Sequence, residues 1–129
     1  MSKMIVNQTS GEIKRSGHRV VDSLYNYTQN QEDYKMTILE FGANNCINCK
    51  RMKKVLDEIP NKYPGQVNVV FYDILKPEDL NFMKLFGIAA IPSQVLLNEQ
   101  GKEFFRNSGY YKPEDLSTTI DKQLSWSSQ

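Results

Sequence analysis

The most reactive side chains of this sequence are two cysteines separated by two residues. Cys46 and Cys49 are the only cysteines among its 129 residues. A structural zinc site takes four ligands, and a catalytic site still takes three. The single histidine, His18, lies far from the cysteines in the sequence, so a metal site is not expected. The spacing instead favours a dithiol that closes and reopens as a disulfide.

The segments around the cysteines indicate how such a pair would react. Residues 36–41 are typical of a buried strand, and residues 50–59 are typical of a helix. A cysteine between a strand and a helix lies at the helix N-terminus, where unpaired N–H groups and the helix dipole favour a thiolate. The thiolate is the form that attacks disulfides. We therefore expect Cys46 to be the exposed, attacking sulfur and Cys49, one turn further in, to be the shielded, resolving sulfur.

A purely structural disulfide is the alternative for this pair. Closing a loop of roughly four residues removes unfolded-chain entropy worth only about 2 kcal/mol. A chain of 129 residues can bury a sizeable core without that contribution. The local sequence therefore favours redox exchange over a structural cross-link.

The composition is that of one ordinary globular domain. The chain is 40% hydrophobic and 24% charged, with a formal net charge of +1. This balance gives no electrostatic reason to expect nucleic-acid binding, and no apolar run approaches the roughly 18 residues of a membrane-spanning helix. Residues 1–20 do not resemble a secretory signal, so the sequence as it stands predicts a cytoplasmic protein. A chain whose signal had been removed would look the same, which leaves the bacterial periplasm as the alternative.

Hydrophobic periodicity predicts an alternation of helices and strands. Residues 1–17 are polar and are predicted to form a flexible arm, in which Met4-Ile5-Val6 is a candidate edge strand. Residues 126–129 are predicted to be a polar tail. Between them the predicted elements are, in order, a helix near 17–30, a strand at 36–41, a helix at 46–59, a strand at 67–72 that is buried on both faces, a helix at about 76–86, a hairpin of strands at 94–97 and 103–106, and a helix at about 112–124.

This order of elements, with the cysteine pair after the first strong strand, resembles thioredoxin over roughly residues 18–125. Four further landmarks match the family: the strand 38–41 with its acid, the segment Gly87–Ser93 around a proline, Gly101 in the hairpin turn, and Gly109. The resemblance implies an α/β protein with the thioredoxin fold, a central mixed sheet of four to five strands flanked by helices. It also implies a thiol–disulfide oxidoreductase that needs no metal or organic cofactor.

The resemblance places Glu40 beneath the cysteines. There, burial would raise the pKa of the carboxyl group and suit it to exchange a proton with Cys49. The alternative is that Glu40 points to solvent, because successive residues of a strand face opposite sides of a sheet.

The resemblance also places a substrate groove beside the cysteines. Pro92 matches the family's cis-proline, which would turn the backbone of Ile91 toward the sulfurs to bind an extended substrate strand. Asn45 is expected at the rim of the site, and Gly109 is expected along the groove. The two tyrosines that follow Gly109 either border the groove or pack in the core.

The sequence departs from thioredoxin around the cysteines. Asn45 stands where the family has tryptophan, Ile47-Asn48 stand where it has Gly-Pro, and Val69 replaces a lysine that neighbours the buried acid. The favoured interpretation is a protein disulfide reductase, which acts on disulfide-bearing proteins and receives electrons from a reductase or a membrane carrier. A disulfide oxidant or isomerase of the same fold is one alternative. A non-catalytic interaction module with an idle disulfide is the other.

Overall fold

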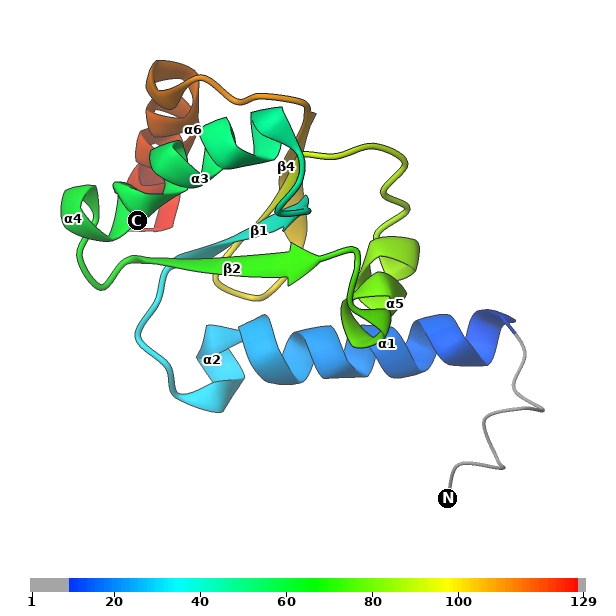
Figure 1. The fold of residues 1–129 in the computed structure, drawn as a ribbon. Coiled ribbons are helices and arrows are strands. Elements are labelled where there is room, and N and C mark those ends of the chain that lie inside the picture. The colour runs from blue at the N-terminus through cyan, green and yellow to red at the C-terminus, as the bar shows by residue number, and fades with distance from the viewer. Residues whose placement is uncertain (1–9, 128–129) are drawn as a thin grey trace.

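The protein folds around one four-stranded sheet. The structure, a computed structural model, describes residues 10–127. The strands lie in the order β2-β1-β3-β4 (Figure 1). Strand β1 (Met36–Gly42) is parallel to β2 (Val67–Asp73) and antiparallel to β3 (Ser93–Leu97), which pairs antiparallel with β4 (Glu103–Ser108). The predicted α/β fold with a mixed sheet is confirmed.

Helices cover both faces of the sheet (Figure 1). One face carries α1 (Ser10–Tyr25), α2 (Tyr27–Asn30) and α5 (Pro77–Leu85), and the other carries α3 (Ile47–Asp57), α4 (Ile59–Lys62) and α6 (Pro113–Ser127). Each face therefore has its own apolar core, and the central strand β1 contributes side chains to both.

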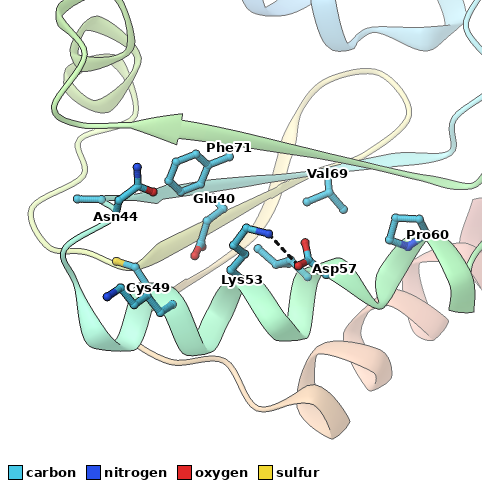
Figure 2. A pocket seen from close by; sticks show the side chains of 11 residues that line it. Glu40, Asn44, Cys49, Lys53, Asp57, Pro60, Val69 and Phe71 are labelled. Atoms are coloured by element: carbon cyan, nitrogen blue, oxygen red, sulfur yellow. Dashed lines mark hydrogen bonds and ion pairs between the residues drawn. The ribbon is translucent and has the colours of Figure 1, made fainter.

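The alternation of β1 decides where its acidic residue points. Leu39 and Phe41 are buried in the core beneath α1 and α5, whereas Ile38 is buried in the core beneath α3 and α6. Because every second residue of a strand faces the same side, Glu40 lies on the same side as Ile38. Figure 2 shows the Glu40 side chain directed toward α3, the helix that begins at the cysteines.

The prediction of a flexible arm over residues 1–17 is wrong for residues 10–17, because α1 begins at Ser10. A Cβ atom at Gly17 would lie 2.8 Å from Cδ2 of Leu85, so the glycine allows α1 to approach α5 closely. The predicted edge strand Met4-Ile5-Val6 lies outside the described residues. At the other end, α6 continues to Ser127, so the predicted tail is helical over its first two residues.

The first predicted helix, 17–30, is in fact two helices. Asn26 separates them, and its side chain caps α2 by accepting the N–H of Thr28 at 3.2 Å. Val21 and Tyr25 are buried against the sheet, but Leu24 is 46% exposed. The C-terminal part of α1 therefore buries one side against the sheet and exposes the other.

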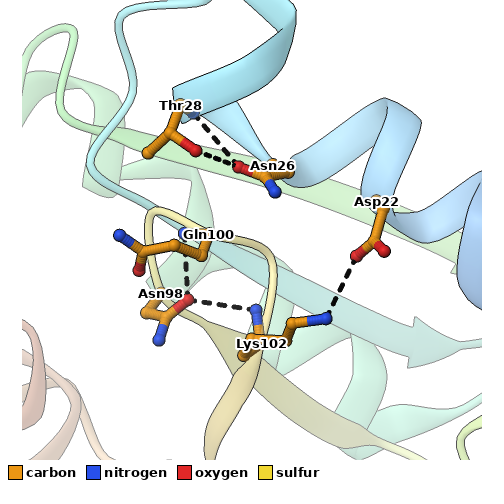
Figure 3. A network of polar contacts seen from close by, with 6 residues as sticks. All are labelled: Asp22, Asn26, Thr28, Asn98, Gln100 and Lys102. Carbon is orange, nitrogen blue, oxygen red and sulfur yellow. Dashed lines mark hydrogen bonds and ion pairs between the residues drawn. The ribbon is translucent and has the colours of Figure 1, made fainter.

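The β3–β4 turn is anchored to the end of α1 (Figure 3). Lys102 Nζ lies 3.4 Å from Asp22 Oδ1, and Oδ1 of Asn98 accepts the N–H of Lys102 at 3.0 Å. Gly101 has a φ of 79°, and a Cβ there would lie 3.1 Å from the carbonyl group of Tyr25. Both observations require glycine at this position.

Candidate active site

The two cysteines lie at the start of α3, directly after the loop that leaves β1. Cys46 is the N-cap residue, with extended backbone angles, and its Sγ accepts the N–H of Cys49 at 3.2 Å. Such a donor stabilises negative charge on the sulfur. Both thiols are free, Cys46 is half-buried, and Cys49 is 6% exposed. The predicted difference in accessibility between the two sulfurs is confirmed.

Cys49 lies against the end of β1. A Cβ at Gly42 would lie 3.1 Å from Cys49 Sγ and 3.2 Å from Cε2 of Phe71, so the strand passes directly beside the sulfur. Burial, and then the hydrogen bond with Cys46, raise the pKa of the Cys49 thiol above its ordinary value. At neutral pH Cys49 is therefore a thiol, and it needs a base before it can attack.

Glu40 is the buried acid of the site. Its side chain is 1% exposed, so the alternative that it points to solvent is wrong. Oε1 accepts a hydrogen bond from Gln94 Nε2 at 2.8 Å, whereas the buried Oε2 has no hydrogen-bond partner among residues 10–127. Burial raises the pKa of Glu40 to about 8, although the bond from Gln94 opposes this shift. A carboxyl group with this pKa can both accept and return a proton near neutral pH.

Cys49 and Glu40 line the same pocket, which has a volume of about 400 Å³ (Figure 2). Lys53 and Asp57 also line the pocket and form an ion pair, in which Nζ and Oδ2 are 2.9 Å apart. Phe71, which forms part of the wall, is 48% exposed. The prediction that its strand is buried on both faces was wrong, because β2 is an edge strand of the described sheet. The pocket is therefore lined both by a buried thiol and by a buried carboxyl group.

A polar network that sequence reasoning missed joins Glu40 to the predicted groove. Gln94, which pairs with Glu40 across the sheet, accepts a hydrogen bond at Oε1 from Asn107 Nδ2 at 2.9 Å. The same Nδ2 donates to the carbonyl of Gly109 at 3.2 Å, and the Gly109 N–H donates to the carbonyl of Pro92 at 2.7 Å. The available signal was a glutamine at the start of an otherwise apolar strand.

The structure brings the predicted groove residues to the cysteine end of the sheet. The Ile91–Pro92 peptide bond is cis, as the resemblance implies, and Gly109 has a φ of 91°. Asn45 is exposed in the loop before Cys46. The substrate-binding roles of Ile91, Pro92, Asn45 and Gly109 stay predictions.

The two tyrosines after Gly109 have different places. Tyr111 is 5% exposed and packs in the core, where its N–H lies 3.3 Å from Met52 Sδ. Tyr110 is half-buried, and the guanidinium carbon of Arg51 lies 4.0 Å from the centre of its ring. Arg51 Nη1 also donates to Oδ1 of Asn48, between the cysteines, at 3.0 Å. Tyr110 therefore belongs to the border of the site and Tyr111 to the core.

Two further features of the described chain concern metals and membranes. Within residues 10–127, no three His, Cys, Asp or Glu side chains come together as a metal site. Across the same residues, no helix combines the length and the apolar character that crossing a membrane requires.

Comparisons with known proteins extend over most of the chain. The family model described as "Thioredoxin-like domain" matches residues 23–124. A thioredoxin of Staphylococcus haemolyticus is 26% identical over 106 residues, which are 82% of this chain and 96% of that protein. Thioredoxin C-2 of Corynebacterium nephridii is 29% identical over 87 residues, which are 67% of this chain and 78% of that protein. The crystal structure of the thioredoxin NaTrxh from Nicotiana alata matches with a TM-score of 0.62 and 31% identity, covering 78% of this chain and 83% of that one.

Proposed function

Because the chain belongs to the thioredoxin-like family, and is therefore a thiol–disulfide oxidoreductase, we propose that it acts as a protein disulfide reductase. The Cys46 thiolate attacks one sulfur of a substrate disulfide, and the other substrate sulfur leaves as a thiolate that takes up a proton. The product is a mixed disulfide between Cys46 and the substrate.

Release of the substrate depends on Cys49. Glu40, in its ionised form, accepts the Cys49 proton across their shared pocket. The Cys49 thiolate then attacks the Cys46 sulfur and breaks its bond to the substrate. The second substrate sulfur leaves as a thiolate and takes up the proton that Glu40 had accepted. Two electrons have passed to the substrate, and Cys46 and Cys49 are left as a disulfide. An electron-donating reductase or a membrane carrier returns two electrons and two protons to them.

One observation supports reduction, rather than oxidation, of substrate disulfides. The buried thiol of Cys49 lines the same pocket as Glu40, a carboxyl group whose pKa lies near neutrality. A reductase must resolve each mixed disulfide quickly, before the substrate's own thiol reverses the reaction. A buried thiol with a raised pKa resolves slowly unless a base is close by. Glu40 is that base.

Insulin reduction with dithiothreitol as electron source tests this function. We expect the wild-type chain to accelerate reduction, and we expect Cys46→Ser and Cys49→Ser to lose this activity. Cys49→Ser should also accumulate a mixed disulfide between Cys46 and insulin. Lys54→Gln, which changes an exposed residue of the same helix outside the pocket, is the control. A wild-type chain that leaves the uncatalysed rate unchanged would be a non-catalytic module.

A further inference from the structure

The segments that border Cys46 carry positive charge and no negative charge. Residues 43–51, which hold the cysteines, contact residues 108–112 because Arg51 stacks on Tyr110. Residues 108–112 in turn contact residues 87–93, because the Gly109 N–H donates to the carbonyl of Pro92. Together the three segments contain three basic residues, Lys50, Arg51 and Lys112, and neither aspartate nor glutamate. Since the whole chain has a net charge of only +1, the rest of it is net negative. These three connected segments are therefore net positive in a chain that is nearly neutral.

Arg51 differs from the other two cations because its position is fixed. Its guanidinium stacks on the Tyr110 ring at 4.0 Å and donates one hydrogen bond to Asn48 at 3.0 Å. These contacts join the turn that holds the cysteines to the loop that follows Gly109. A guanidinium has five N–H donors, and its other donors have no partner among the described residues. A stacked, pre-positioned guanidinium loses little entropy when it binds a ligand.

No carboxylate neutralises this cation in the described part of the chain. The ion pairs there involve Lys35, Lys53, Lys102 and Arg106, and none involves Arg51. Ile47, beside Cys46, is 78% exposed and offers an apolar contact next to the charge. A carboxylate is the group that matches a planar guanidinium, since it accepts two parallel N–H bonds.

We propose that Arg51 is a specificity-determining residue, which binds a carboxylate beside the disulfide of the substrate, so that protein disulfides flanked by Asp or Glu are preferred. This inference rests on the proposed reductase function. Lys50 and Lys112 contribute to it by attracting acidic segments over a longer range. Arg51 does not touch the reacting sulfurs, so it acts on substrate binding rather than on the exchange step.

Three synthetic peptides with the same internal disulfide test the proposal. One carries Asp and Glu beside the cysteines, the second carries Ser and Asn, and the third carries Lys. We expect wild type to prefer the acidic peptide over the neutral one by about fivefold in kcat/KM, the size of a good exposed ion pair. Arg51→Gln should remove most of this preference through a higher KM for the acidic peptide, with kcat and the neutral peptide almost unchanged. Arg51→Lys should keep part of the acidic preference, because lysine retains the positive charge but lacks the paired, planar N–H donors of a guanidinium.

The controls separate recognition from a merely structural role of the stacked arginine. Lys54→Gln removes the same charge from an exposed site on the same helix, and it should leave all three peptides unchanged. The acidic preference should also shrink as ionic strength rises. If Arg51→Gln slows all three peptides equally, or if wild type reduces them at equal rates, the proposal is overturned while the reductase function stands. If wild type reduces none of them, the proposed function fails and the inference fails with it.

Discussion

Gln94 donates a hydrogen bond from Nε2 to Oε1 of Glu40 at 2.8 Å, deep in the sheet and beneath the active-site helix. The bond holds one carboxyl oxygen and leaves Oε2 without a partner among residues 10–127. Glu40 and Cys49 line the same pocket, so the proposed mechanism assigns the proton exchange to this unpaired oxygen.

Replacing Gln94 by Leu should raise the pKa of Glu40 further, because the hydrogen bond that stabilises its carboxylate is lost. Less of the base form is then present at a given pH, so the rising limb of the pH–rate profile for insulin reduction should move to higher pH. Asn107→Ala removes the next member of the network without removing the bond to Glu40. Asn107→Ala should therefore shift the pH–rate profile less than Gln94→Leu does. Superimposable profiles for wild type and Gln94→Leu would exclude this role.

Replacing Glu40 by Gln should stabilise the protein at neutral pH. Burial raises the folded-state pKa of Glu40 from 4.5 to about 8, so the folded chain binds the proton more tightly than the unfolded chain does. Stability should therefore fall as pH rises from about 4.5 to about 8. At pH 7 the cost is up to about 3 kcal/mol, and the variant avoids it.

Urea unfolding at pH 5, 7 and 8.5 measures this effect. The difference in the free energy of unfolding between Glu40→Gln and wild type should grow along that series. Insulin reduction by the variant should be slower near pH 7, since Cys49 has lost its proton acceptor. A difference that does not vary with pH, together with an unchanged rate, would remove Glu40 from the mechanism.

Limiting iodoacetamide near pH 7 should label Cys46 in preference to Cys49. Cys46 is the more exposed sulfur and receives the N–H of Cys49, whereas Cys49 is 6% exposed and has a raised pKa. Mass spectrometry of the digested protein locates the adduct. Predominant labelling of Cys49 would reverse the two assigned roles.

Replacing Gly101 by Ala should cost about 2–3 kcal/mol of stability, because it combines a positive φ with a close contact to the backbone of Tyr25. Gly65→Ala is the matched control. Gly65 has a similar φ of 73°, but a Cβ there would have nothing within 4 Å. Gly65→Ala should cost about 1 kcal/mol, because it has only the backbone strain of an alanine at positive φ and no steric contact. Equal losses in urea unfolding would show that the contact with Tyr25 contributes nothing.

Local sequence patterns predicted most of the fold, because each strand and helix near the cysteines has a clear hydrophobic period. The resemblance to thioredoxin placed Glu40 beneath the cysteines, whereas the strand pattern alone left open that it points to solvent. The Gln94–Asn107 network could not be predicted, because it depends on the register between strands far apart in the sequence. Phe71 was misplaced for a similar reason, since exposure of its strand depends on the order of strands in the sheet. The polar sequence of residues 10–17 did not indicate a helix, and the close approach of Gly17 to Leu85 between α1 and α5 depends on the tertiary structure.

The reduction potential of the Cys46–Cys49 couple tests the reductase direction most directly. Ile47 and Asn48 replace a rigid Gly-Pro dipeptide, so closing the disulfide is less favoured than in thioredoxin. We predict a potential of about −200 to −250 mV, above the roughly −270 mV of thioredoxin and far below the roughly −120 mV of a dedicated oxidant. Equilibration with glutathione buffers, followed by quantification of free thiols, gives the value. A value above about −150 mV would make the chain an oxidant and would contradict the proposed function as a disulfide reductase.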